Sequence, residues 1–434
     1  MNYRVYSRAE HNVSRKMINP SALKVLYRLR DEGYQACLVG GCVRDLLLGR
    51  EPKDFDVVTD AHPEDVRRIF RNCQLIGRRF RLAHVHYGED VIEVATFRSL
   101  QSLDDSDDRV VQNGRIIRDN AYGTIEEDAF RRDFTVNALY YNINDFSVVD
   151  YVGGMVDHQA GLLRLIGNPV DRYREDPVRM LRAIRFAVKL GFTLAPECAT
   201  PIPALSHLLR DISAHRLYEE VLKLFLAGYA LQTFEQLRHY RLFSVLFPQT
   251  DACLAHESQG FPHTFICKAL ESTDQRLRDD KTTSPCFLFA ALLWEPVRAM
   301  ARLAMLDGEE EQMAYQEAAS AVISRQAKRV AIPRGIIQQA REVWLLQCRF
   351  DDTAGSRPFR LLGHPRFRAA YDFLLLRAEA DDIDSELAQW WQHFVAANDT
   401  ERKSMTHTGS GSTRTTNRKR RKKPGAPRNE STAT

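Results

Sequence analysis

A pair of aspartates two residues apart, Asp54 and Asp56, is the first feature of the sequence that could do chemistry. Residues i and i+2 of a β-strand point to the same face, so a strand over residues 54–58 would present both carboxylates side by side. Two adjacent carboxylates repel each other unless a cation lies between them. Mg²⁺ prefers oxygen ligands and bridges to nucleotide phosphates. The spacing therefore predicts a Mg²⁺ site at Asp54 and Asp56.

A glycine turn, Gly40 and Gly41, lies shortly before these aspartates, between an expected buried strand and an expected helix. Without Cβ atoms the backbone can approach a ligand closely, and the N–H groups of the turn suit a triphosphate. Arg44, one turn into the helix, could add positive charge to the same phosphates. Either motif alone is weak evidence. The ordered series of strand, glycine pair, arginine-bearing helix and aspartate pair is much more specific for a nucleotide site.

Two further acids compete for the role of a third carboxylate. Glu93 lies in the apolar stretch 91–95, where a lone charge is costly unless it faces a site. Asp133 follows Arg131 and Arg132, so it could equally form a structural ion pair. The sequence leaves both candidates open.

A helix expected from residue 175 carries a second set of polar residues. Asp176 and Pro177 are typical first residues of a helix. Asp176, Arg179 and Arg182 fall opposite an apolar side made of Val178, Leu181, Ile184 and Val188. Adenine offers an N6 donor beside an N1 acceptor, so Asp176 could accept and Arg179 donate. Cytosine shows the same order, whereas guanine and uracil reverse it. This face would select A and C without a template but not separate them; the alternative is an ordinary solvated face.

The elements that must position these residues form a mixed head followed by helices, which predicts an α+β fold. Strands and helices alternate up to about residue 97, and residues 99–120, with four aspartates between 104 and 108, are expected to form a mobile acidic loop that closes over the site. From about residue 151 to 398 the pattern is mainly helical. The predicted parts are an N-terminal extension, a head, a helical neck carrying the base-reading helix, a helical RNA-binding body and a disordered basic tail, over residues 1–20, 21–150, 151–235, 236–400 and 401–434.

Charge is distributed unevenly along the 434 residues. The chain carries a net charge of +4, but residues 401–434 alone hold ten Lys and Arg against two acids. Such a tail suggests a polyanionic partner. Eight scattered cysteines without a CxxC pair indicate reduced thiols and a cytoplasmic protein. No secretory signal and no apolar run long enough for a membrane span is expected.

These motifs resemble, in order and spacing, those of the bacterial class II tRNA nucleotidyltransferase/poly(A) polymerase family of the DNA polymerase beta superfamily. The matching stretches are residues 40–45, 54–56, 131–135 and 175–179. The resemblance implies a small catalytic head with neck, body and tail domains, and metal binding by Asp54 and Asp56. It also implies roles for Arg132 and Asp133 around the ribose and phosphates, and base recognition by Asp176 and Arg179, with Arg182 nearby.

Within this family, residues 11–15, 331–333 and 361–372 and the basic C-terminus look like the poly(A)-adding branch. The chain also lacks the HD dipeptide of the phosphohydrolase domain found in some CCA-adding enzymes. The resemblance implies a monomeric enzyme that transfers AMP from ATP to RNA 3′ ends and works with RNA-decay proteins. A CCA-adding tRNA nucleotidyltransferase and an inactive RNA-binding protein are the alternatives.

Overall fold

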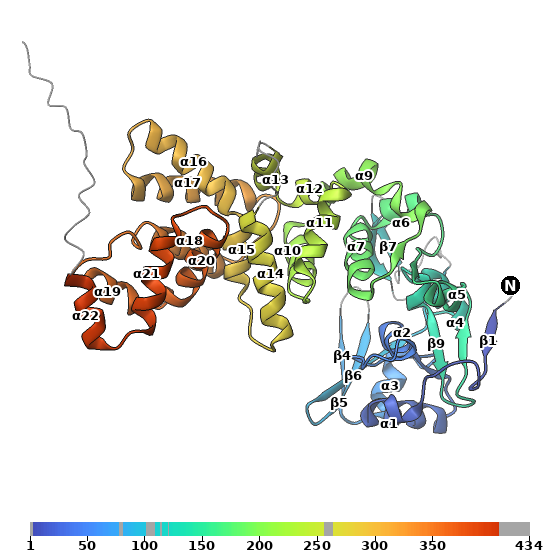
Figure 1. The fold of residues 1–434 in the computed structure, drawn as a ribbon. Helices are drawn as coiled ribbons and strands as arrows, with labels where there is room; N and C mark the ends of the chain where they lie inside the picture. Colours follow the sequence, from blue (N-terminus) through green and yellow to red (C-terminus); the bar gives the residue numbers. More distant parts are fainter. Residues whose placement is uncertain are drawn as a thin grey trace, which may run out of the picture. The chain divides into compact units, whose positions relative to one another are not determined.

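The chain folds as two compact units, Met1–Arg341 and Glu342–Thr434. The computed structural model describes residues 3–77, 81–100, 109–112, 115–119, 121–255 and 264–407 (Figure 1). No helix among these residues is both long enough and apolar enough to cross a membrane.

A mixed sheet organises the first unit. Within the described residues it has eight strands in the order β1 (Arg4–Tyr6), β10 (Val148–Asp150), β9 (Leu139–Asn142), β2 (Ala36–Val39), β3 (Asp56–Thr59), β6 (Asp90–Thr96), β5 (Leu82–Tyr87) and β4 (Cys73–Ile76). Neighbours pair antiparallel except β3 and β6, which pair parallel. This parallel pair lies inside the sheet and carries Asp56 and Glu93, two of the acids singled out from the sequence.

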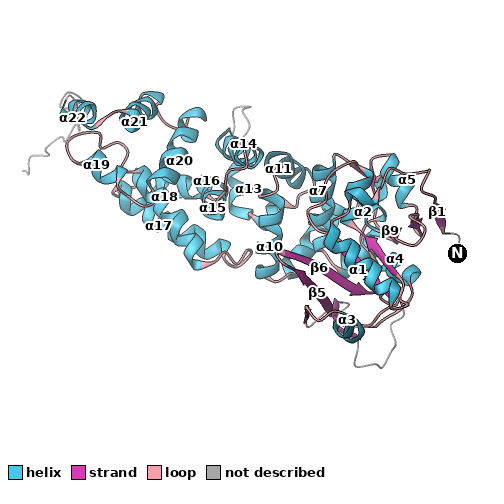
Figure 2. Cartoon of the chain, turned by 90° about the horizontal axis from the view of Figure 1, so that it is seen from below, coloured by secondary structure: helices cyan, strands magenta, loops and turns pink. Residues whose placement is uncertain are grey.

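The two faces of the sheet are buried against different elements. Helices α1 (Pro20–Asp31), α2 (Gly41–Leu47) and α3 (Pro63–Ile69) pack on the face that carries Leu38, Val57 and Val94 (Figure 2). The opposite face carries Val39 and Val58 and packs on a second core beneath α4 (Ile125–Arg131). Because side chains alternate along a strand, Asp56 and Glu93 lie on this second face.

Helices follow the sheet in the first unit (Figure 1). They are α5 (Gly154–Gln159), α6 (Pro169–Glu175), α7 (Val178–Leu190), α8 (Pro196–Ala199), α9 (Ile202–Leu205), α10 (Ala214–Phe225), α11 (Ala230–His239), α12 (Phe243–Leu246), α13 (Pro248–Ala255), α14 (Thr264–Arg278), α15 (Pro285–Leu292), α16 (Trp294–Leu306) and α17 (Glu311–Gln326), with the short strands β11 (Leu162–Leu163) and β12 (Thr193–Leu194). Helix α18 (Arg334–Gln347) contains the boundary between the units.

The second unit consists of α19 (Arg357–Leu362), α20 (Phe367–Glu379), α21 (Ser385–Ala396) and α22 (Asp399–His407). Its core forms around Trp391, which is fully buried and donates its indole N–H to the carbonyl of Phe350 at 2.9 Å. The ring of Phe350 meets Trp391 edge-on, with 4.9 Å between the centroids.

The α+β prediction is confirmed, with four corrections to its elements. The strand expected from residue 54 begins at Asp56, because the chain before it is exposed and irregular. Part of the expected acidic loop pairs as the hairpin β7 (Arg109–Gln112) and β8 (Arg115–Asp119). The N-terminal extension supplies the edge strand β1, and the first residues of the expected tail belong to α22. The predicted mobility of 101–108 and disorder of 408–434 fall outside the described residues.

Candidate active site

A cavity of about 550 Å³ opens between the second face of the sheet and helices α4, α6, α7 and α10. Among the described residues, six arginines and five acids line it. The arginines are Arg98, Arg131, Arg132, Arg172, Arg179 and Arg216, and the acids are Asp56, Glu93, Asp128, Glu175 and Asp176. So many arginines in one cavity suit a polyanionic ligand such as a nucleotide triphosphate.

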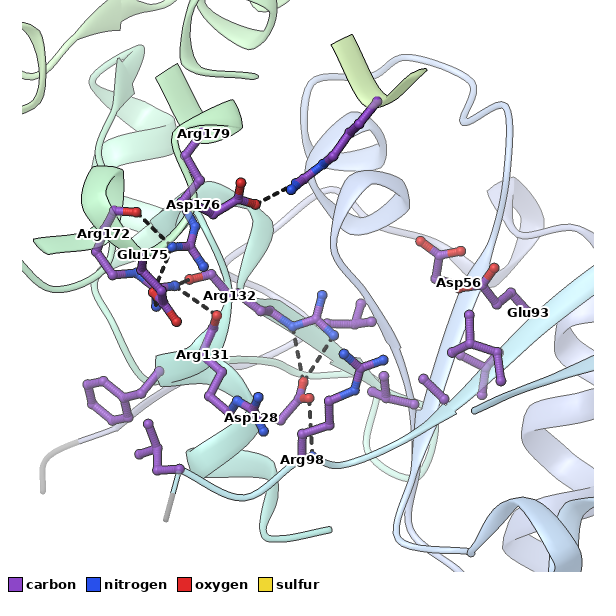
Figure 3. Close-up of a pocket in the computed structure, with 18 residues that line it drawn as sticks. Asp56, Glu93, Arg98, Asp128, Arg131, Arg132, Arg172, Glu175, Asp176 and Arg179 are labelled. Atoms are coloured by element: carbon purple, nitrogen blue, oxygen red, sulfur yellow. Dashed lines mark hydrogen bonds and ion pairs between the residues drawn. The ribbon is translucent and has the colours of Figure 1, made fainter. Parts of the chain in front are cut away.

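The sheet wall of the cavity presents two carboxylates side by side. Asp56 and Glu93 are paired in register on the parallel strands β3 and β6 (Figure 3). Burial and then the negative charge of Glu93, against the opposing charge of Arg132, raise the pKa of Asp56 to about 6. Asp54, exposed just before β3, also raises this pKa. A bound cation would relieve the repulsion, and carboxylate oxygens are the donors that a hard divalent ion prefers.

The glycine turn lies against Arg132. Gly40 has a φ of +79°, a left-handed conformation that favours glycine. A Cβ added there would lie 3.4 Å from Nη1 of Arg132. Arg132 lines the cavity, so the turn and this guanidinium border the same space.

Arg44 differs from its prediction as a phosphate contact. It is only 3% exposed and does not line the cavity. Its Nε and Nη2 donate to Asp45 at 2.8 and 2.6 Å, and its Nη1 donates to Asn137 at 2.6 Å. The guanidinium is thus occupied inside the protein, because burying a charge requires partners.

Asp133 lies in a half-buried ion pair with Arg182. Its Oδ2 accepts from Nε and Nη2 of Arg182 at 2.9 and 2.5 Å, and its Oδ1 accepts from the Phe134 N–H and the Asn137 amide. Burial alone would raise the pKa of Asp133, but Arg182 and these donors outweigh it and lower the pKa. The pair connects the residues after α4 with helix α7, outside the cavity lining.

The helix wall pairs each of its acids with arginine. Asp176 accepts from Nη2 of Arg216 at 2.6 Å, and its other oxygen accepts from the backbone N–H of Val178. Arg179 donates to Glu175 at 2.7 Å (Figure 3). Glu175 also accepts from Arg172 at 2.8 Å. The two residues predicted to read the base therefore lie in the cavity, but each is held by a neighbour.

Of the ten residues predicted from the sequence, the cavity lining contains Asp56, Arg132, Asp176 and Arg179. It does not contain Gly40, Gly41, Arg44, Asp54, Asp133 and Arg182. Sequence reasoning missed Arg98, Asp128, Arg172 and Arg216 as lining residues. Asp128 lies in α4, and Arg132 follows directly after this helix, four residues later. This spacing predicts an ion pair. Arg216 offered no such signal, because its partner Asp176 lies 40 residues away.

Three family descriptions match successive parts of the chain. "Poly A polymerase head domain" matches residues 36–164, "Probable RNA and SrmB-binding site of polymerase A" matches residues 191–254, and "Polymerase A arginine-rich C-terminus" matches residues 307–425.

Individual relatives agree with these matches. Poly(A) polymerase I of Salmonella typhi is 48% identical over 434 residues, covering 99% of this chain and 93% of the relative. A CCA-adding enzyme of Bacillus pumilus is 36% identical over 246 residues, covering 56% and 59%. The crystal structure of the Bacillus stearothermophilus CCA-adding enzyme in complex with CTP superimposes with a TM-score of 0.57 at 25% identity, covering 90% of this chain and 82% of that one. The chain therefore belongs to the bacterial poly(A) polymerases, within the family that also contains the CCA-adding enzymes.

Proposed function

We propose that this chain is a polynucleotide adenylyltransferase that adds AMP from ATP to RNA 3′ ends without a template. The observation that carries the proposal is 48% identity to poly(A) polymerase I over nearly the full chain, together with an arginine-rich cavity that has two adjacent carboxylates on one wall. The sequence match to the CCA-adding enzyme of Bacillus pumilus has a lower identity of 36% and covers only 56% of the chain, which makes CCA addition the weaker alternative.

The two walls of the cavity suggest how ATP is oriented. The base lies at the helix wall, where Arg179 can donate to a ring nitrogen. Arg216 and the Val178 N–H hold Asp176, and Glu175 holds Nη1 of Arg179, so both residues would meet the base from fixed positions. The triphosphate extends toward the sheet wall along Arg132 and Arg98. The positive charges of these two side chains offset the negative charge of the phosphates.

The metal site is assigned to the sheet wall. Enzymes of this family generally use a divalent metal ion, and Asp54 and Asp56 would hold Mg²⁺ here. Burial and the charge of Glu93 raise the pKa of Asp56, and this supports the assignment, since a bound cation would remove the repulsion between the two acids. Such an ion supplies charge neutralisation for the phosphates and alignment of the attacking and leaving oxygens. Glu93, next to Asp56 in register, is the better candidate for the third carboxylate, because Arg182 engages Asp133.

The RNA substrate, the cellular location, the oligomeric state and the protein partners are also proposals. The arginine-rich C-terminal match and the predicted RNA-binding segment support RNA as the second substrate. We infer a cytoplasmic location from cysteines spaced unlike a disulfide framework, and a monomer with RNA-decay proteins as partners from the family resemblance.

An extension assay with a single nucleotide tests the function. The full chain is incubated with Mg²⁺, ATP alone and an RNA oligonucleotide unrelated to tRNA, and the products are separated by length. We expect long, ATP-dependent extension and little extension with CTP alone. Addition of a single A, or addition only to tRNA ending in CC, would identify a CCA-adding enzyme. Absence of incorporation from every nucleotide would indicate an inactive RNA-binding protein.

A further inference from the structure

Asp128 is a buried acid in the cavity wall with an unusual number of partners. Its side chain lies in α4, and the residue is only 6% exposed. One oxygen, Oδ2, accepts from Nε and Nη2 of Arg132 at 3.1 and 3.0 Å and from the hydroxyl of Tyr140 at 2.8 Å. Oδ1 lies 3.4 Å from the backbone N–H of Arg98. Asp128 is thus fixed by three residues on three segments.

This arrangement fixes the guanidinium of Arg132. Asp128 takes the edge formed by Nε and Nη2, and the Tyr140 hydroxyl also lies 3.1 Å from Nε. Burial would lower the pKa of Arg132, but Tyr140 and Asp128 outweigh it and raise the pKa, so the guanidinium stays charged. The remaining nitrogen, Nη1, faces the turn at Gly40, where an added Cβ would lie 3.4 Å away. The Nη1 group of Arg132 is therefore held as a donor that points toward the turn at Gly40.

An acid in this place needs an explanation, because a carboxylate inside a cavity for a polyanion repels its ligand. The cost is offset if the acid orients a cation that contacts the ligand, since a preorganised donor binds without paying for its own ordering. Asp128 reaches the cavity beside Arg132, and its bonds use the edge of the guanidinium that faces away from Gly40.

We propose that Asp128, assisted by Tyr140, is a positioning residue that holds Nη1 of Arg132 toward the triphosphate of bound ATP. Asp128 acts through Arg132 and does not contact the nucleotide. The inference rests on the proposed function, because it requires a nucleotide in this cavity. Arg132 is thereby placed at the β- and γ-phosphates, so a substitution of Asp128 should not change the binding of a nucleotide that lacks these phosphates.

The test compares ATP with AMP as ligands of the full chain in Mg²⁺ buffer, by calorimetry. Asp128→Asn should weaken ATP binding about tenfold, the loss expected for a charge-assisted contact, and leave AMP affinity within about twofold. In the extension assay the KM for ATP should rise by a similar factor, with kcat and the KM for RNA nearly unchanged. Tyr140→Phe, which removes one hydroxyl and keeps the carboxylate, should show the same pattern with a smaller change.

Asp157 provides a matched control. Its side chain is 9% exposed, as is that of Asp128, and it accepts from Nε of Arg164 at 3.1 Å and from the Thr135 hydroxyl at 2.7 Å. It does not line the cavity. Asp157→Asn should lower the melting temperature and leave the ratio of ATP to AMP affinity unchanged.

Three outcomes would overturn the inference. The affinities for ATP and for AMP could both stay at their wild-type values in Asp128→Asn and Tyr140→Phe. Asp128→Asn could weaken ATP and AMP equally, which would make it a structural residue like Asp157. Finally, if the wild-type chain binds no ATP, the proposed function fails and this inference fails with it. If Asp128→Asn does not fold, Tyr140→Phe alone decides between the first two outcomes.

Discussion

The two walls of the cavity hold their acids in opposite ways. On the sheet wall Asp56 and Glu93 face each other, and within the described residues neither forms an ion pair with Lys or Arg, although Nε2 of His84 lies 3.6 Å from Glu93. On the opposite wall Asp128, Glu175 and Asp176 each accept from arginine. Acids paired with arginine orient those arginines, whereas two adjacent acids without an arginine partner repel each other until a cation binds. The contrast separates residues that shape the site from residues that await a ligand.

The largest expected effect comes from neutralising the sheet wall. Asp56→Asn should reduce AMP incorporation by about 10³-fold or more, because a metal ligand contributes several kcal/mol to the transition state. Asp54→Ala should act in the same direction, with RNA affinity unchanged in both variants. The measurement is single-turnover incorporation at saturating Mg²⁺. Asp60→Asn, just after β3 and hydrogen-bonded to the Gln35 N–H, is the control and should keep normal turnover. Near-normal activity of Asp56→Asn would move the metal site elsewhere.

The same substitution should change stability in opposite directions at two positions. Without metal, Asp133→Asn should destabilise the protein by about 2 kcal/mol, since it breaks a charge-assisted pair with Arg182. Asp56→Asn should stabilise it, because it removes the repulsion with Glu93. Thermal unfolding in chelator at pH 7.5 or higher, where both carboxyls are ionised, measures both.

The pH dependence of stability tests independently whether Asp133 stabilises and Asp56 destabilises the folded protein. The pKa of Asp133 is lowered on folding, so its contribution is present at neutral pH and is lost as pH falls through the unfolded value of about 3.9 and below. The pKa of Asp56 is raised to about 6, so the folded state binds more protons than the unfolded state between about pH 4 and 6. Stability should therefore fall as pH rises through that window, and Asp56→Asn should abolish the fall. Equal responses of the two variants would refute the contrast between an acid paired with arginine and an acid beside a second acid.

The helix wall should control base choice more than rate. Arg179→Ala should raise the KM for ATP and weaken discrimination against GTP and UTP, at a cost of roughly 1.5–3 kcal/mol for a hydrogen bond to a charged donor. A competition assay with mixed nucleotides measures the discrimination between ATP and the other nucleotides. Arg174→Ala is a suitable control, because Arg174 is exposed and lies 3.9 Å from Asp171, outside the cavity. An unchanged nucleotide preference in Arg179→Ala would place base reading elsewhere.

The smallest effect on chemistry is expected from the basic tail, which belongs to neither wall. Arg402 in α22 donates to the carbonyls of Phe394 and Val395, so the truncation should begin after His407. Residues 408–434 carry eight Lys and Arg. Their removal should weaken RNA binding and reduce the slope of log affinity against log salt, with kcat at saturating RNA nearly unchanged. Identical slopes for the two proteins would assign RNA binding to the folded part alone.

Local patterns predicted the elements of the head better than its contacts. The strand over 36–39, the helix after Gly41 and the strands on either side of Gly88 follow from alternation and turn residues, and the structure contains them. The pairing of Asp56 with Glu93 depends on strand order, which no local pattern encodes. The partners of Arg44, Asp133 and Asp176 are likewise set by packing between distant segments, so charge alone could not show which residues reach the cavity.

The parallel pairing of β3 with β6 has a consequence for how the protein folds. Asp56 and Glu93 meet only after the intervening chain, with α3, β4 and β5, has formed a crossover and closed. Closing such a loop costs chain entropy before its contacts repay it, so parallel pairs tend to form late. A nascent chain ending before β6 cannot contain the carboxylate pair at all. During synthesis the sheet wall is thus assembled only when residues 90–96 have emerged and joined β3.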